Sequence, residues 1–212
     1  MRLDEIKIET LKIMFANTDD MLIEENIDTY KTDEQYKAYL AMMNGSINRC
    51  FSDIERKKVL PSKTFALSFE SGTTSDKFIR FNLSELIQDY KDIDRITYED
   101  AYGNYNGNAA YKMEGSVLVL PIFDEEKEYY KVLYKPRIAR ITSATEESEE
   151  ISIPEDIASA IPYYVKGDLF RVDEPREASE ARNWYEAAME QSYYEASAKD
   201  NCVYATFDQT EI

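Results

Sequence analysis

The sequence predicts an α+β protein: a helical bundle built from the N- and C-terminal segments, with an inserted antiparallel β section. Near both ends of the chain, apolar residues recur at every third or fourth position, as they do along one face of a helix. In the middle they alternate with polar residues, as they do in strands with one buried face. We therefore predict a helical bundle over 1–60 and 150–198, a β section over 61–149 and an extended C-terminal tail over 199–212.

The N-terminal segment predicts two helices. The first covers 3–15, where the apolar residues share one face. Thr32 and Gln35 have the spacing of a capping box, and the apolar period that follows predicts a long amphipathic helix over 33–56. This helix ends before Pro61, because a proline disfavours helical geometry at the residue in front of it.

The middle of the chain predicts a series of short strands. They fall at 63–69, 77–83, 94–100, 109–115, 116–121 and 128–136. The links between them are short, which favours antiparallel pairing. One link, 101–108, is rich in glycine and asparagine and suits a hairpin turn with Tyr102 and Tyr105 at its tip. The acidic segment 141–152 predicts an exposed linker that leads back to the helices.

The C-terminal segment predicts further helices. Apolar residues at steps of four run from Ile157 to Leu169, and Pro162 lies among them. Either one helix kinks at Pro162, or a short turn ends there and Pro162 opens a second helix at its first position. Pro175 then opens a last helix that runs to about residue 197.

The last helix carries a stripe of small residues, which lets another helix approach closely. The stripe consists of Ala178, Ala181, Tyr185 and Ala188, and Trp184 flanks it. Beyond this helix, apolar residues alternate again at Val203, Ala205 and Phe207, which predicts an extended tail without a partner strand nearby in sequence.

The amino-acid composition disfavours several classes of function. The net charge is −17, so the surface repels nucleic-acid phosphate and a DNA-gripping role is disfavoured. The 17 tyrosines suit either core packing or wet contacts between proteins. There is no histidine, which removes the commonest general base and metal ligand. Cys50 and Cys202 have no metal or redox spacing, and Cys50 occupies an apolar helical position that predicts a place in the core.

The motifs in the sequence predict neither an enzyme nor a cofactor or metal site. The acidic residues of 124–128 read as a solvated turn, and Asp100 with the asparagines that follow it lacks the spacing of a calcium loop. The stretch "GTTSDK" lacks the lysine and hydroxyl pair of a phosphate-binding loop. No run of apolar residues is long enough to cross a membrane, and we expect a product of the cytoplasm.

The layout resembles the head-to-tail adaptor, or connector, proteins of tailed bacteriophages. Three stretches carry the resemblance, and together they cover roughly 1–60 and 127–195. The first is the opening helix with "YLAMMNGSINRCFSDI", which looks like the family's second helix. The second is "YYKVLYKPRIARIT" running into "EISIPEDIASAIPYYVKGDLF", and the third is "DEPREASEARNWYEAAMEQ", which looks like the closing family helix after an acidic turn.

The resemblance implies a structural virion protein of the neck between head and tail, assembled in the cytoplasm of the host bacterium. About twelve copies would form a ring that binds the portal protein, extends the DNA channel and receives the tail or the next neck protein. DNA would pass through without specific binding, because an acidic wall offers phosphate no favourable contact.

On this reading, three surfaces are predicted to make contacts. Ala178, Ala181, Trp184, Tyr185 and Ala188 would form the interface between subunits. Tyr102 and Tyr105 would face the tail, and Val203 and Phe207 would contact the portal or a neighbouring subunit. Two other functions remain open: another phage tail or neck structural protein, and an acidic DNA-mimic inhibitor.

Overall fold

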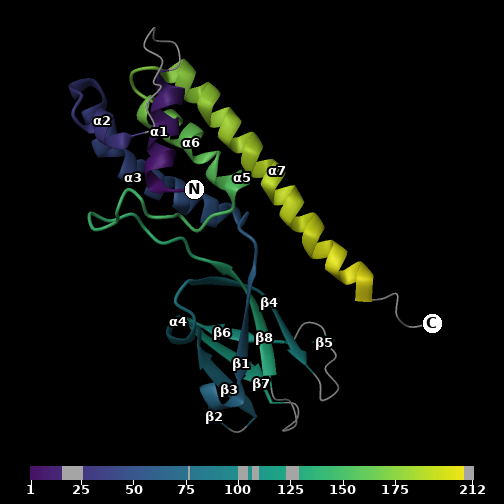
Figure 1. Cartoon of the computed structure of the whole chain (residues 1–212). Coiled ribbons are helices and arrows are strands. Elements are labelled where there is room, and N and C mark those ends of the chain that lie inside the picture. The colour runs from purple at the N-terminus through teal and green to yellow at the C-terminus, as the bar shows by residue number, and fades with distance from the viewer. Residues whose placement is uncertain (16–25, 76, 100–104, 107–109, 123–128, 208–212) are drawn as a thin grey trace. The chain divides into compact units, whose positions relative to one another are not determined.

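The computed structural model describes residues 1–15, 26–75, 77–99, 105–106, 110–122 and 129–207, and it confirms an α+β protein with antiparallel sheets. The chain forms two compact units (Figure 1). We call Met1–Leu60 with Ile138–Ile212 the helical unit, and Pro61–Arg137 the β unit. The predicted start of the insertion at residue 61 agrees with this division. The predicted end at residue 149 is wrong, because Ile138 and the residues after it belong to the helical unit.

The helical unit contains six helices among the residues that the structure describes. They are α1 (Leu3–Met14), α2 (Ile27–Lys31), α3 (Glu34–Lys57), α5 (Glu155–Ala158), α6 (Ile161–Leu169) and α7 (Pro175–Phe207) (Figure 1). Their apolar faces meet in one core, in which Ile6, Ile47, Phe51 and Val165 are completely buried. Burial of these faces offsets the conformational entropy lost when the helices form.

The N-terminal cap of α3 differs from the predicted one. Asp33, and not Thr32, is the capping residue, and its carboxylate accepts a hydrogen bond from the backbone N–H of Gln35 at 2.8 Å. At the other end, Lys58 adopts a left-handed conformation with φ of 56°, which ends the helix before Pro61.

Pro162 separates two helices rather than kinking one. The short helix α5 ends at Ala158, and α6 begins at Ile161 with Pro162 in its first turn. The first-turn N–H groups of a helix have no partner within the helix, so a proline there removes no hydrogen bond. The second of the two predicted alternatives is therefore the one that the structure contains.

The helix α7 is longer than predicted and replaces most of the expected tail. It runs for 33 residues, through Phe207, and Figure 1 shows it extending beyond the other helices of the helical unit. The prediction of an extended segment over 199–212 is therefore wrong for 199–207. No glycine or proline interrupts the sequence after Pro175, so nothing in the backbone ends the helix earlier. Residues 208–212 lie outside the described part of the chain.

Two polar side chains of α3 hold the returning chain after the β unit. The side-chain amide of Asn48 donates to the carbonyl oxygen of Ile141 at 2.8 Å and accepts from its N–H at 2.9 Å. The carboxylate of Glu55 accepts the N–H of Ile138 at 2.8 Å and binds the guanidinium of Arg140 at 2.9 Å. These bonds give the backbone of an irregular segment the partners that a strand or helix would otherwise provide.

The start of α1 holds the next part of the same segment. The N–H groups of Leu3 and Asp4 donate to the carbonyl oxygens of Glu149 and Glu147, at 3.1 and 2.9 Å. The buried Lys7 binds the carboxylate of Glu147 at 2.8 Å. The acidic segment is largely exposed, as predicted, and these bonds fix it on the helical unit.

The β unit contains eight strands among the described residues. They are β1 (Lys63–Ser68), β2 (Thr73–Ser75), β3 (Phe78–Asn82), β4 (Tyr90–Glu99), β5 (Tyr105–Asn106), β6 (Lys112–Glu114), β7 (Val117–Pro121) and β8 (Tyr129–Pro136), with short helices η1 (Phe69–Ser71) and α4 (Leu83–Leu86) between them. One sheet has the order β1-β8-β4-β5 and the other β2-β3-β7-β6, and every pair is antiparallel.

The two sheets share one hydrophobic core. Leu67 and Val132 of the first sheet and Phe81 and Leu118 of the second are completely buried in it. The hydroxyl of Tyr130 in the first sheet donates to the carbonyl oxygen of Pro121 in the second at 3.1 Å. The alternation read from the sequence therefore points one side of each sheet inward, as in packed sheets generally.

Candidate interaction surfaces

The described residues contain no arrangement that suggests a metal or nucleophilic centre. No three His, Cys, Asp or Glu side chains in this part of the chain gather as metal ligands would. Cys50 is buried in the helical core, as predicted, and burial raises the pKa of its thiol, which keeps it protonated. None of the described helices is long and apolar enough to cross a membrane.

The small-residue stripe of α7 packs against the chain's own helix α6. Ala178, Ala181 and Tyr185 are buried within the single chain, and Ala188 is half-buried beside the same core. A Cβ atom added at Gly167 of α6 would lie only 3.0 Å from the carbonyl oxygen of Ala178, so the two helices approach closely. The prediction that the stripe forms a subunit interface is corrected: these residues already have their partner.

Tyr185 joins α7 to α3 through a buried polar contact. Its hydroxyl donates to Oδ2 of the buried Asp53 at 2.9 Å, and Arg56 and Lys57 bind the same carboxylate. Burial, followed by the nearby Cys50 and Asp53, raises the pKa of Tyr185. The residue is therefore a fixed part of the core and not a surface aromatic.

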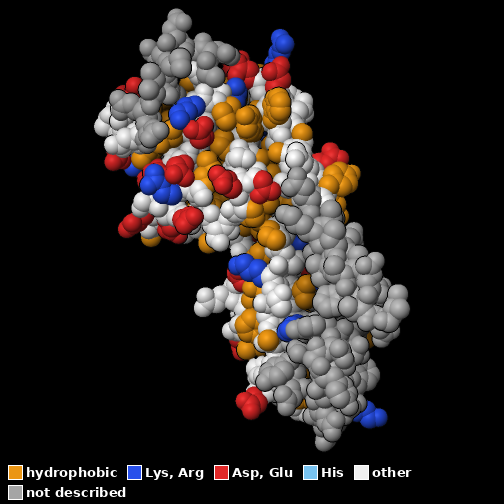
Figure 2. Space-filling model, turned by 45° about the vertical axis from the view of Figure 1, so that its right-hand side comes forward, with side chains coloured by type: hydrophobic (Ala, Val, Ile, Leu, Met, Phe, Trp, Pro, Cys, Tyr) orange, Lys and Arg blue, Asp and Glu red, His pale blue; other side chains and the backbone are white. Residues whose placement is uncertain are grey.

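Outside its buried stripe, α7 exposes aromatic residues. Trp184 is 68 % exposed, Tyr193 50 % and Tyr194 64 %. The ring of Trp184 lies 6.4 Å from that of Tyr163 on α6, which supports it from one side. Figure 2 shows hydrophobic side chains at the surface of the helical unit, interspersed with acidic ones. Of the predicted interface residues, Trp184 is the one left fully available to a partner. We call Trp184 and Tyr194 the aromatic face, and Tyr193 lies half a turn of the helix away from Trp184.

A second surface of the helical unit is a groove of about 500 Å³ at the junction of α6 and α7. We call it the arginine groove; it is lined by Arg49, Tyr164, Gly167, Asp168, Arg171, Pro175, Ala178, Ser179 and Arg182. Three elements contribute its guanidinium groups: α3, the turn after α6, and α7. In a chain of net charge −17, such a concentration of arginine suits a ligand or partner that carries carboxylates or other oxyanions.

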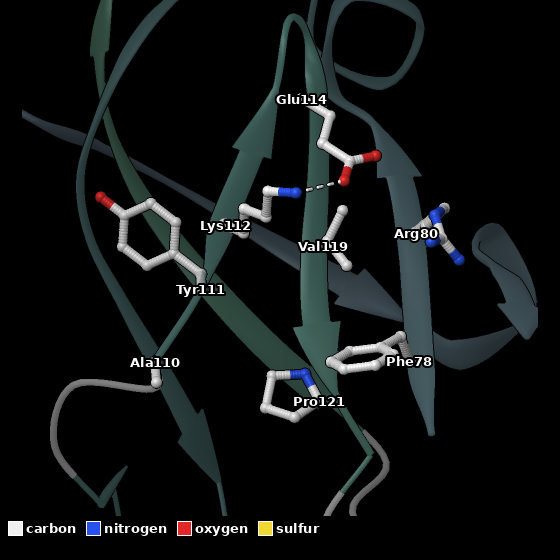
Figure 3. A pocket seen from close by; sticks show the side chains of 8 residues that line it. All are labelled: Phe78, Arg80, Ala110, Tyr111, Lys112, Glu114, Val119 and Pro121. Atoms are coloured by element: carbon white, nitrogen blue, oxygen red, sulfur yellow. Dashed lines mark hydrogen bonds and ion pairs between the residues drawn. The ribbon is translucent and has the colours of Figure 1, made fainter. Parts of the chain in front are cut away.

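The β unit has a pocket of about 400 Å³ on the outer side of strands β3, β6 and β7 (Figure 3). Val119 lies in its middle, with Phe78 and Pro121 toward one end. The ammonium of Lys112 donates to Glu114 at 2.8 Å toward the other end. Phe78 is 47 % exposed, so this pocket offers an apolar floor with a charged margin, as protein-binding surfaces do.

Asp89, which directly precedes β4, binds one side chain of β8 and one of β1. The carboxylate of Asp89 accepts hydrogen bonds from the Tyr134 hydroxyl at 2.8 Å and from Lys63 at 2.6 Å. Burial, followed by the bond to Asp89, raises the pKa of Tyr134 to about 12. Burial acts in the opposite direction on Asp89, but the bonds from Lys63 and Tyr134 lower the pKa of its carboxyl.

We expect this contact to make the β unit sensitive to alkali. The pKa of Tyr134 rises from about 10 to about 12 on folding, so its contribution to stability is complete below pH 10 and is lost as the pH rises toward 12. Urea denaturation between pH 8 and about 11.5 should show a falling free energy of unfolding. For Tyr134→Phe, the free energy of unfolding should fall less steeply with pH than it does for the natural chain. Equal slopes would show that Tyr134 does not cause the sensitivity to alkali.

The remaining predicted contact residues fall at the margin of the described structure. Tyr102 lies outside it, and Tyr105 is placed by its backbone alone, in β5, where it pairs with Glu99 of β4. Val203 and Phe207 belong to α7, and their side chains are not described. Contacts of these residues with a tail, portal or neighbouring subunit therefore stay predictions.

Sequence reasoning missed several surface residues. Tyr193 and Tyr194 lie within the helix predicted to about residue 197 but outside its small-residue stripe, so the sequence pattern did not single them out. Arg171 and Arg182 were passed over because the groove joins parts of the chain that only the fold brings together. Phe78 was placed in a strand without a face, since a strand pattern does not tell which of its two faces is covered.

No protein-family model matches the chain, and no curated protein matches it either. The function therefore has to be argued from the surfaces themselves and from the resemblance in layout.

Proposed function

We propose that the chain is a structural virion protein, a head-to-tail adaptor that forms a ring on the portal, extends the DNA channel and receives the tail. The observation that carries the proposal is the two-sided helix α7. Its buried side closes the core of the helical unit, and Trp184 and Tyr194 are exposed outside that side. A monomer rarely exposes such a set without a partner, because aromatic side chains gain most from burial at protein contacts.

The second support is the presence of separate surfaces on separate units. The helical unit carries the aromatic face and the arginine groove, and the β unit carries the pocket around Val119. A neck subunit has to bind copies of itself, the portal and the next component, and each needs a surface of its own. The net charge of −17 agrees with a channel that DNA crosses without being retained.

The mass of the assembled particle tests the proposal directly. The purified chain is mixed with the portal ring of the phage that encodes it, and the complex is measured by native mass spectrometry. We expect about a dozen copies of the chain on each portal ring, as the closed symmetry of such rings requires. A chain that never joins the portal and instead inhibits a DNA-binding enzyme would contradict the adaptor and support a DNA mimic.

Replacing Trp184 and Tyr194 together by Ser should separate assembly from folding. Both side chains are largely exposed, so the free energy of unfolding should change by no more than about 0.5 kcal/mol for each. Binding to the portal ring or to neighbouring copies should weaken by about tenfold or more, because exposed aromatic residues provide much of the energy of protein contacts. Sedimentation with portal rings measures the effect.

Asn183→Ser is the matched control for this pair, because Asn183 is an exposed polar residue of the same helix. It should assemble as the natural chain does. A Trp184/Tyr194 variant that folds and assembles normally would show that the aromatic face is not an assembly surface.

A further inference from the structure

We propose that the helical units contact one another head to tail, with the acidic turn of one copy held in the arginine groove of the next. The acidic turn is residues 146–150, "EESEE". This inference rests on the ring assembly proposed above and names the contact that builds it.

The arginine groove keeps an excess of positive charge. Arg49 is paired with Asp168, whose carboxylate it meets through Nε at 3.1 Å. Arg182 shares its partner Glu186 with Lys57, so one carboxylate serves two cations.

Arg171 supplies further positive charge. It is exposed, and within the described part of the chain it forms no ion pair. An incoming carboxylate would therefore meet cations that the chain itself does not fully neutralise.

The groove is also held in shape before any partner arrives. The guanidinium carbon of Arg182 lies 4.1 Å from the centre of the Tyr164 ring and 5.5 Å from that of Tyr185, which fixes the plane of the group. Arg49 is fixed by Asp168, which also accepts the hydroxyl of Ser46 at 2.7 Å. Because these side chains are already ordered, binding an acidic partner loses less conformational entropy.

The acidic turn has the complementary properties. Its backbone is fixed by the bonds from Leu3 and Asp4 to the carbonyl oxygens of Glu149 and Glu147. Glu146, Glu149 and Glu150 are exposed, and none of the three forms an ion pair with another described residue. The turn therefore presents carboxylates on a rigid backbone, and its three exposed acids are opposite in charge to the arginines of the groove.

The two surfaces cannot meet within one copy. The acidic turn is bonded to the first residues of α1, whereas Lys166, next to the groove, binds the carbonyl oxygen of Ile13 near the end of α1 at 3.0 Å. The twelve residues of α1 span about 18 Å. Figure 1 shows the segment after the β unit and the turn between α6 and α7 toward opposite ends of the helical unit. A contact between unlike surfaces of two copies repeats from copy to copy and closes into a ring when the rotation allows.

The charge of the whole chain favours an acidic turn over nucleic acid as the occupant. A duplex would place many phosphates against a surface of net charge −17, whereas a short turn brings its carboxylates to the groove alone. The partner is therefore a second copy of this chain, and nucleic-acid binding becomes an outcome of the test.

Two charge-reversed variants test the contact. One carries Arg171→Glu with Ser179→Glu in the groove, and the other carries Glu149→Lys with Glu150→Lys in the turn. All four side chains are exposed, so folding should be unaffected. Each variant alone should assemble at least about tenfold more weakly than the natural chain, on the portal ring or free in solution. An equal mixture should recover assembly, because the reversed groove then accepts the reversed turn.

Glu70→Lys with Glu85→Lys is the control for the turn variant, since it makes the same change in net charge on the β unit. It should assemble as the natural chain does. Normal assembly of each reversed variant alone, or a mixture that stays unassembled, would overturn the contact. Duplex DNA that binds the natural chain and is lost with the reversed groove would overturn it in favour of nucleic acid.

Cross-linking separates this contact from the ring itself. In a Cys202→Ser background, chains with Ser148→Cys and chains with Ser179→Cys are mixed and treated with a short bismaleimide. Cross-linked pairs are expected, and Ser75→Cys on β2 in place of Ser148→Cys should give none. Cross-linked copies that form open filaments and never close would support the contact and contradict the ring. Closed rings without cross-linking would keep the ring and overturn the contact.

Discussion

Replacing Tyr185 by Ala should lower the free energy of unfolding by about 4 kcal/mol, as truncation of a fully buried aromatic side chain generally does. Tyr185 has no exposed surface, packs edge-on against Tyr164 with ring centres 5.0 Å apart, and donates to Asp53 at 2.9 Å. Tyr185→Phe keeps the ring and loses the hydroxyl, so it should cost about 1–3 kcal/mol by leaving the buried carboxylate short of one donor. Urea denaturation followed by circular dichroism measures both changes.

Tyr194→Ala serves as the control for Tyr185, because it removes an exposed tyrosine from the same helix. Its effect on stability should stay within about 0.5 kcal/mol. If Tyr185→Ala were as stable as the natural chain but failed to assemble, Tyr185 would belong to a subunit interface after all. That outcome would restore the prediction made from the small-residue stripe.

Glu55→Ala should lower the free energy of unfolding by about 3 kcal/mol. The Glu55 side chain is 2 % exposed, and its carboxylate satisfies both the N–H of Ile138 and the guanidinium of Arg140. Removing it leaves a buried N–H and a charged group without this partner, which is among the more costly single changes in a protein. Glu55→Gln keeps an acceptor for the N–H, so it should cost about half as much.

Arg140→Ala is the partner control for Glu55, since it removes the cation and leaves the bond to Ile138. Hydrogen exchange at Ile138 provides a local readout that general destabilisation does not mimic. Its N–H should exchange faster in Glu55→Ala than in Arg140→Ala when both are compared at equal global stability. Equal exchange in the two variants would show that Glu55 does not hold the returning chain.

The regular elements could be predicted from the sequence because their patterns are local. The period of α3 continues through residues 34–57, and β3 and β7 fall within the predicted strands 77–83 and 116–121. Pro162 left two possibilities, since a proline is compatible with a kink and with a first turn. Which of the two occurs depends on how α5 and α6 pack, and a local sequence pattern does not determine packing.

The contacts between distant segments could not be predicted. The stripe around Ala181 correctly indicated a close helix contact, but a periodic pattern does not tell whether the other helix belongs to the same copy. The segment after the β unit has no period at all. Its conformation depends on Asn48 and Glu55, which the sequence shows only as two polar positions of a long helix.

The aromatic face and the arginine groove illustrate the same limit for function. Trp184 was identified because it flanks the small-residue stripe, whereas Tyr193 and Tyr194 lie in the predicted helix but outside that stripe. The acidic turn was noticed as charge but not as a fixed surface, since its rigidity comes from backbone bonds to α1.

The anchoring of Ile138 by Glu55 has a consequence for how the gene can change. Val59 and Leu60, where the chain leaves the helical unit, are buried in the same core as Ile138, where it returns. The chain segments at both ends of the insertion are thus held by residues of the helical unit. Recombination between relatives could replace everything from 61 to 137 with a longer, shorter or unrelated module while the junction stays intact. A protein of this design can acquire a different β module in one genetic step.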